Sequence, residues 1–434
     1  MPQITLHLLL LSALVGCALG IITGLIPGLH VNNVAILLIA LAPTLLQHGI
    51  SPVCIAIIII ANAVAHTFLD FVPSIFLGAP EAETALVVLP GHRLLLEGRG
   101  VEAIRLSALG SAASVIVALG LVLPFSILFE YVYPVLDRYM GWILVLIALI
   151  MVGTESGERI DPWETKLKYK GYAALMFLLS GALGILSFTK ASLMYPVIAL
   201  GEPSILFPLL SGLFGASMLV ISLITKSTIP KQVKTRFKLS KRKVARGIFT
   251  GSLAGSLVAW LPGVSPAVAT VVTRLAVKEG GEDSSREFIV AVSGVNTANA
   301  IFGLIALYII QRPRSGAMVA IKSIMDPNVW DMPLVVLLLA VIVGVSILSY
   351  FATIFIGDHT SKILFRTSYS KLSAAVLLCI GIMVVLFTGL FGGIVFATAM
   401  VIGMLPPYLK VRKTHAMGVL LLPLILYFFG IFTW

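Results

Sequence analysis

A proline-glycine pair closes a glycine-spaced apolar stretch in each half of the chain, and the two stretches share one spacing. The first reads GCALGIITGLIPGLH, and the second, GSLAGSLVAWLPGVS, follows 235 positions later. Apolar segments broken by Gly and Pro at corresponding positions of two halves are the best sequence sign of a transporter's central site. The matched residues are Gly16 and Gly251, Gly20 and Gly255, Pro27 and Pro262, and Gly28 and Gly263.

The composition requires a membrane. Of 434 residues, 59% are apolar and 11% charged, whereas a soluble domain has roughly a quarter charged. The first segment has no Lys or Arg before Arg93, so it lacks the charged n-region of a secretory signal and reads as a retained span. Apolar runs of roughly span length lie near 6–27, 53–79, 104–129, 140–153, 171–188, 204–225, 247–273, 287–311, 332–356, 372–388, 389–407 and 416–434.

These runs predict an all-α integral membrane protein with ten to twelve transmembrane helices, multi-pass in the cell (plasma) membrane. A shorter apolar run at 31–46 fits a half-span or a re-entrant piece. The halves are predicted to be related repeats with broken or re-entrant helices at the Pro-Gly motifs. Inverted repeats are favoured over parallel ones, although the parity of the intervening spans leaves both open.

A basic loop separates the two halves. Nine Lys and Arg residues and no acidic residue lie between Lys226 and Arg246, which predicts a cytoplasmic loop that also touches anionic membrane lipids. Topology thus accounts for much of the net charge of +11, and no nucleic-acid partner is predicted. The predicted domains are 1–225, the first transmembrane repeat; 226–246, the basic loop; and 247–434, the second repeat.

The Pro-Gly breaks are the candidate substrate site. Pro removes a backbone donor and Gly relaxes the backbone, so a helix that reaches either motif stops or unwinds there. A broken helix offers N–H groups and a positive dipole end to an anion. Simple kinks, and hydrogen bonds between helices, are the alternative. Polar residues follow each break: His30, Asn32 and Asn33 after the first, and Ser265 and Thr270 after the second.

A second polar group lies inside an apolar run. Asn62, His66 and Asp70 are spaced by four residues, so a helix places them on one face. An Asp within a span is costly unless it faces the bundle interior, so this stripe predicts a proton- or cation-responsive site. The alternative is a solvated Asp70 at the membrane interface. The uncharged counterparts in the second half are Asn296 and Asn299.

Enzyme and metal templates fail. The chain has no HExxH, GxSxG or phosphate-loop lysine motif. Cys17, Cys54 and Cys379 are isolated in apolar runs, so neither a metal nor a disulfide is predicted. We therefore expect no enzyme activity and no cofactor, with Na⁺ or a proton as the candidate coupling ion.

With these motifs the chain resembles the large permease subunit of tripartite tricarboxylate transporters. The resemblance rests on the two glycine-spaced Pro-Gly segments, on NTANA at 296–300 and on the PGHRLLLEGRGVEA loop at 90–103. It implies a multi-helix permease that uses an ion gradient for carboxylate uptake. It also implies two partners, a small membrane subunit and an extracellular (periplasmic) binding protein; a homodimer is left open.

The sequence therefore predicts a secondary active transporter of an anionic substrate, most consistent with tricarboxylate-like uptake. The alternative is a polyprenyl-phosphate translocase, because PGVS at 262–265 also resembles a motif of lipid-linked phosphate carriers. Asn62, His66 and Asp70 are the predicted coupling-ion residues. The predicted substrate-binding residues are Pro27, Gly28, His30, Asn32, Asn33, Pro262, Gly263, Ser265, Thr270, Asn296 and Asn299.

Overall fold

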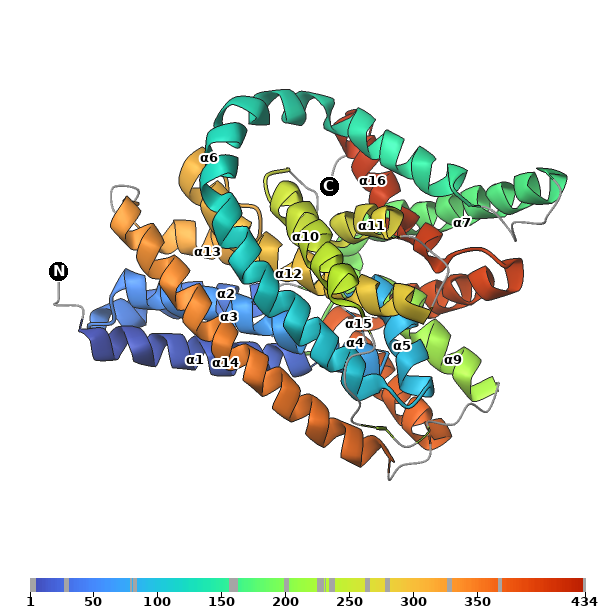
Figure 1. Ribbon diagram of the computed structural model, residues 1–434, viewed down its shortest axis with the longest axis horizontal. Helices are drawn as coiled ribbons and strands as arrows, with labels where there is room; N and C mark the ends of the chain where they lie inside the picture. Colours follow the sequence, from blue (N-terminus) through green and yellow to red (C-terminus); the bar gives the residue numbers. More distant parts are fainter. Residues whose placement is uncertain are drawn as a thin grey trace.

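The regular structure of the chain is entirely helical in the part described. The structure is a computed structural model and describes residues 5–26, 31–78, 80, 84–155, 163–198, 203–224, 230, 232–233, 239–261, 266–277, 282–325, 330–365 and 369–431. Within these residues sixteen α-helices are joined by short 3₁₀ and π segments (Figure 1). The predicted all-α class is confirmed.

The helices of the first part of the chain are α1 (Leu6–Leu25), α2 (Val31–Gln47), α3 (Pro52–Leu69), α4 (Phe71–Phe76), α5 (Val88–Leu96), α6 (Gly100–Gly153), α7 (Trp163–Thr189), α8 (Leu206–Leu210) and α9 (Ser217–Ile224). Those after the basic loop are α10 (Lys241–Val258), α11 (Pro266–Ala276), α12 (Glu282–Ile310), α13 (Gly316–Ile324), α14 (Met332–Phe365), α15 (Tyr369–Leu409) and α16 (Gly418–Phe428). The short segments are η1 (Ala85–Val87), η2 (Ala191–Leu193), η3 (Ser211–Ala216) and η5 (Lys413–Met417).

Seven of the described helical segments are long and apolar enough to cross a membrane. The predicted number was ten to twelve, and part of the difference arises because predicted spans merge. The runs at 104–129 and 140–153 form one helix, α6, which continues through Pro124 and Pro134 and arches over the molecule in Figure 1. The seven segments are Leu6–Leu25, Pro52–Phe76, Gly100–Leu136, Trp163–Thr189, Asp283–Ile310, Met332–Thr360 and Ser373–Leu409.

Two of these spans form the centre of the protein. The most apolar window of Pro52–Phe76 is 94% buried and that of Asp283–Ile310 is 89% buried, whereas the other five spans are buried by 44% or less. An apolar helix that is covered all round is a core helix, and one with an exposed apolar face has lipid as its solvent. α3 is covered mainly by α1 and α14, and α12 mainly by α6 and α10.

Glycines set how closely the central helices approach. α1 packs against α3, and α10 packs against α12 (Figure 1). A methyl group on Gly16 would meet the backbone of Ile58 in α3, and one on Gly251 would meet the backbone of Ala291 in α12. Small residues allow such backbone contact in membranes, where no hydrophobic force draws helices together.

A buried acid fastens the end of α6 to η5. Glu155 accepts hydrogen bonds from His415 Nε2 at 2.6 Å and from Arg412 Nε at 3.0 Å. Burial alone would raise the pKa of the Glu155 carboxyl, but the His415 hydrogen bond and the Arg412 charge outweigh it and lower that pKa below its ordinary value. In the basic loop, the described residue Gln232 is held at the end of α5. Its Nε2 donates to Leu95 O and its Oε1 accepts from Gly100 N.

The glycine contacts give the first testable expectation. Gly251→Ala places a methyl group against the backbone of α12, so it should lower the free energy of unfolding by about 1–3 kcal/mol. Gly344→Ala in α14 is the matched control, because no atom lies within 4 Å of the added methyl. Thermal unfolding of the detergent-purified variants measures both. Equal midpoints for the two variants would contradict the close packing of α10 on α12.

The hydrogen bonds of Glu155 with His415 and Arg412 predict a stability that depends on pH. Because its folded pKa lies below the unfolded value of about 4.3, the carboxylate stabilises the fold above that value and loses this effect as the pH falls through the folded pKa. Compared with the wild-type protein, the Glu155→Gln variant should therefore have a clearly lower midpoint of thermal unfolding at pH 7. The difference between the two midpoints should shrink progressively below about pH 4. Glu164→Gln, at an exposed position of α7, should leave the midpoint unchanged at both pH values.

Candidate functional site

A cavity of about 250 Å³ lies where α2, α3, α11 and α12 meet the turn into α13. Four residues singled out in the sequence line it: His66 and Asp70 from α3 and its end, and Asn296 and Asn299 from α12. The stripe of the first half and its counterpart in the second half are thus brought to one place.

Asp70 is the acidic residue of this cavity. It follows the last residue of α3 and is only 2% exposed, so it is a buried carboxylate and not a solvated one. Asn296 Nδ2 donates to Asp70 Oδ2 at 2.8 Å, which joins α12 to the end of α3. A second bridge, between the Thr67 and Thr297 hydroxyls at 3.2 Å, joins the same two helices.

His66 is connected to Asn62 through a threonine of α1. The His66 Nδ1 atom lies 3.0 Å from Thr23 Oγ1, and the Thr23 hydroxyl lies 3.3 Å from Asn62 Oδ1. The single hydroxyl proton of Thr23 is donated either to Asn62 or to Gly20 O, which lies 3.2 Å away, and in both cases His66 donates from Nδ1 to the Thr23 oxygen. Thr23 therefore links Asn62 to His66, which lines the cavity, and the Asp70 carboxylate accepts from Asn296 on the same cavity wall.

Helix α13 begins at the cavity wall. Ser315, which lines the cavity, caps α13 by accepting a hydrogen bond from Met318 N at 3.3 Å. A helix N-terminus presents backbone N–H groups and a partial positive charge, so the start of α13 favours an anion in the cavity. Val31 of α2 and Pro266 of α11 also line the cavity, and the residues just before each of them lie outside the described part of the chain.

Arg314 supplies a full positive charge. It lies in the turn between α12 and α13 and lines the cavity, and its Nη2 donates to the hydroxyl of Tyr133 in α6 at 2.6 Å. Arg312 contacts the same hydroxyl at 3.3 Å but is not part of the lining. A guanidinium can bind a carboxylate with two parallel hydrogen bonds.

The sequence reasoning missed Arg314. The signal was the QRPRS segment directly after an apolar span, which gives two arginines without an acidic neighbour. A positive φ of 53° at Gln311 turns the chain after α12, and that turn could not be read from the pattern.

The other predicted site residues are placed as follows. Asn62 is buried behind His66, and Thr270 is buried in α11 with its hydroxyl bonded to Ala267 O; neither lines the cavity. Asn32 and Asn33 belong to the first turn of α2, but their side chains are outside the description. Pro27, Gly28, His30, Pro262, Gly263 and Ser265 lie outside the described residues.

Comparison with known proteins assigns the chain. The family described as "Tripartite tricarboxylate transporter TctA family" matches residues 10–418. The chain belongs to the TctA family. An uncharacterized protein of Methanocaldococcus jannaschii is 28% identical to this TctA-family chain over 430 residues, which cover 96% of this chain and 98% of the relative. No solved structure matches the chain.

Membership of the TctA family makes this chain a transporter permease and not an enzyme. The matched region runs from α1 to α16 and contains every element that lines the cavity. Together with the seven candidate spans, it indicates a multi-pass membrane protein. The predicted resemblance is confirmed.

The Asp70–Asn296 bond can be tested by a double-mutant cycle. Asn296→Ala removes the donor to a buried carboxylate, so it should lower the free energy of unfolding by about 1–3 kcal/mol. In an Asp70→Asn background the same change should cost less, because no charge is left without its donor. Asn299→Ala is the matched control in the same cavity. Additive effects at the first pair would show that the two side chains do not interact.

Proposed function

We propose that this protein is a secondary active transporter that takes up a small di- or tricarboxylate, driven by a proton or Na⁺ gradient. The observation that carries the proposal is the lining of the 250 Å³ cavity, where Arg314 adjoins the Ser315-capped N-terminus of α13. Charge-assisted hydrogen bonds from a guanidinium and from helix N-termini recognise carboxylates. The family description supports the same substrate class.

Asp70 supplies the coupling. A carboxylate substrate and the Asp70 carboxylate share one small buried cavity, and like charges at such separations repel strongly. A proton or a Na⁺ ion at Asp70 removes that repulsion, so the substrate and the cation bind favourably together and poorly alone. The Asn296 amide fixes one carboxylate oxygen, and His66 lies on the same cavity wall.

Two related halves are the architecture that this function favours. Gly16 and Gly20 contact α3, and their counterparts Gly251 and Gly255 contact α12, which supports repeats at 1–225 and 247–434 on either side of the basic loop. We assign the loop to the cytoplasm because of its nine basic residues. Inverted repeats would let the halves rock around the cavity.

The partners follow from the family. A tripartite system contains a small membrane subunit and an extracellular binding protein, and we propose both as partners of this chain. The binding protein would deliver the carboxylate to the outer side, opposite the basic loop. The cavity would then be reached from that side before the carboxylate moves inward.

Arg314 is tested by uptake into proteoliposomes. With the accessory subunits present, labelled citrate should accumulate under an inward proton or Na⁺ gradient, and Arg314→Gln should reduce the initial rate at least about tenfold, because each lost charged contact costs on the order of 1.5–3 kcal/mol. The matched control is Arg312→Gln, which loses a bond to the same Tyr133 hydroxyl but does not line the cavity. Equal loss in both variants would assign Arg314 a structural role.

Asp70 is tested by the ion dependence of the same uptake. Asp70→Asn keeps the size of the side chain but removes the charge that a cation would neutralise. Accumulation of citrate against its own concentration gradient should therefore be lost, while exchange of citrate across the membrane persists. Uptake with an unchanged pH and Na⁺ profile would refute the coupling role. If wild-type protein moves no carboxylate but alters the surface exposure of a lipid-linked phosphate, the polyprenyl-phosphate alternative holds.

A further inference from the structure

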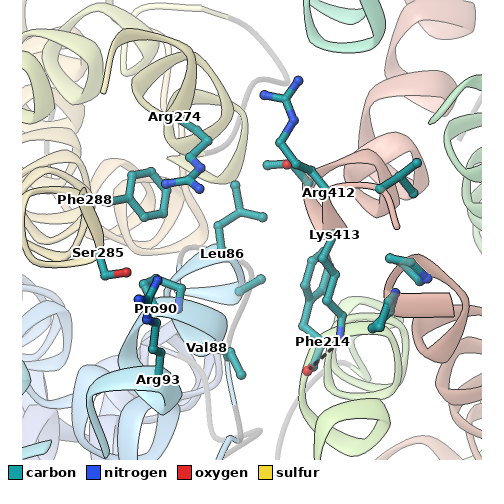
Figure 2. A pocket seen from close by; sticks show the side chains of 15 residues that line it. Leu86, Val88, Pro90, Arg93, Phe214, Arg274, Ser285, Phe288, Arg412 and Lys413 are labelled. Carbon is teal, nitrogen blue, oxygen red and sulfur yellow. Dashed lines mark hydrogen bonds between the residues drawn. The ribbon is translucent and has the colours of Figure 1, made fainter. Parts of the chain in front are cut away.

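A second and larger cavity lies apart from the first. Its volume is about 410 Å³, and it opens between α5, α11 and α12 on one wall and η3, the end of α15 and η5 on the other (Figure 2). No residue that lines the first cavity lines this one. Phe288 of α12 lines the second cavity and Asn296 the first, eight residues or about 12 Å apart along the helix.

The described lining of this cavity is positively charged. Four basic side chains line it, and no acidic residue belongs to the described lining. Arg93 pairs with Glu97 and Arg412 with Glu155. Arg274, which also contacts Phe288, and Lys413 come from opposite walls (Figure 2).

Lys413 is the lining residue that most strongly favours an anion in this cavity. It is 5% exposed and lies outside the seven spans, and its Nζ donates to the Ser217 hydroxyl at 2.7 Å and to Phe214 O at 3.2 Å. Both acceptors are neutral, and burial lowers the pKa of Lys413 to about 7. A buried ammonium without a counter-charge is unfavourable, so an anion in the cavity would stabilise its charged form.

Arg274 faces the cavity from α11. Its guanidinium carbon lies 4.9 Å from the centre of the Phe288 ring, and this stacking orients the group beside the cavity as Figure 2 shows. A guanidinium on one wall and an ammonium on the other can hold separate carboxylates of one molecule. That arrangement suits an anion with two or three carboxylates.

The cavity is on the side of the basic loop. Gln232 and Val233 of that loop bond Leu95, Gly98 and Gly100 at the end of α5, and Arg93 of the same helix lines the cavity. The first cavity lies farther along α12 toward its other end. The two cavities are therefore successive positions across the protein.

We propose that the second cavity is a di- or tricarboxylate site on the cytoplasmic side, in which Arg274 and Lys413 bind the anion after it leaves the first cavity. The assignment of its ligand rests on the proposed transport function. The positive charge of the site would draw the carboxylate inward.

The test uses a thiol placed in the cavity wall. Ser285 lines the cavity (Figure 2), and Cys379→Ser removes the exposed native thiol, since Cys17 and Cys54 are buried. The Ser285→Cys protein in nanodiscs is treated with an anionic or a cationic methanethiosulfonate reagent. Adding Arg274→Gln and Lys413→Met should shift the ratio of the two rates at least about fivefold toward the cationic reagent.

Protection identifies the ligand. Citrate at millimolar concentration should slow modification of the introduced thiol at least about threefold, as expected when citrate occupies the site most of the time. Arg274→Gln should abolish this protection. Arg93→Gln is the matched control, because Arg93 is paired and exposed, and it should retain most of the protection. Arg274→Gln alone leaves Lys413 in place, so the result does not depend on the folding of a variant at a buried lysine.

Several results would overturn the proposal. Citrate protection that is absent, or that survives Arg274→Gln and Lys413→Met together, refutes the site. Protection by inorganic phosphate and not by citrate would assign the cavity to phosphate instead. Slow modification of the thiol that is seen only when the nanodisc contains phosphatidylglycerol would assign the cavity to a lipid headgroup.

The proposed transport function can be refuted separately from the second site. Arg314→Gln should reduce the initial rate of uptake at least about tenfold and leave the protection by citrate intact. Wild-type protein that shows protection without any uptake would refute the proposed transport and keep the second site, whereas uptake without protection would refute only the second site.

Discussion

Close contact between helix backbones is the constraint on which the centre of this protein depends. In lipid, apolar side chains gain little by leaving the solvent for one another, so helices associate through fit and polar contact. Gly16 and Gly251 remove the side chains that would hold α1 from α3 and α10 from α12. This approach lets Thr23 of α1 reach Asn62 and His66 on α3. The hydrogen bonds of Thr23 with Asn62 and His66 thus require the glycines.

The central helices could be predicted to a large extent, because their signals are local. A four-residue spacing places Asn62, His66 and Asp70 on one face wherever the segment is helical, and the offset of 234 residues relates Asn62 to Asn296. The structure brings His66, Asp70 and Asn296 to one cavity. What a pattern cannot give is the distance between segments remote in sequence, such as the 2.8 Å bond from Asn296 to Asp70.

The parts that were not predicted depend on turns and on long-range contact. Arg314 reaches the cavity only because the chain reverses after α12 at Gln311. α6 continues through Pro134, which lies in the gap between the predicted spans 104–129 and 140–153, since neighbouring helices can satisfy the backbone groups that a proline leaves free in a membrane. The second cavity combines α5, α11 and α12 with η3, the end of α15 and η5, segments that share no motif.

The course of α12 has a thermodynamic consequence. This one continuous helix carries Phe288 into the second cavity and Asn296 and Asn299 into the first. If both cavities bind the anion as proposed, a rotation of this one helix would reshape the two sites together. Occupancy of either site would then change the affinity of the other by an equal factor, because linkage between binding equilibria is reciprocal. The carboxylate on one side of the membrane would in this way regulate how readily the next one is accepted from the other.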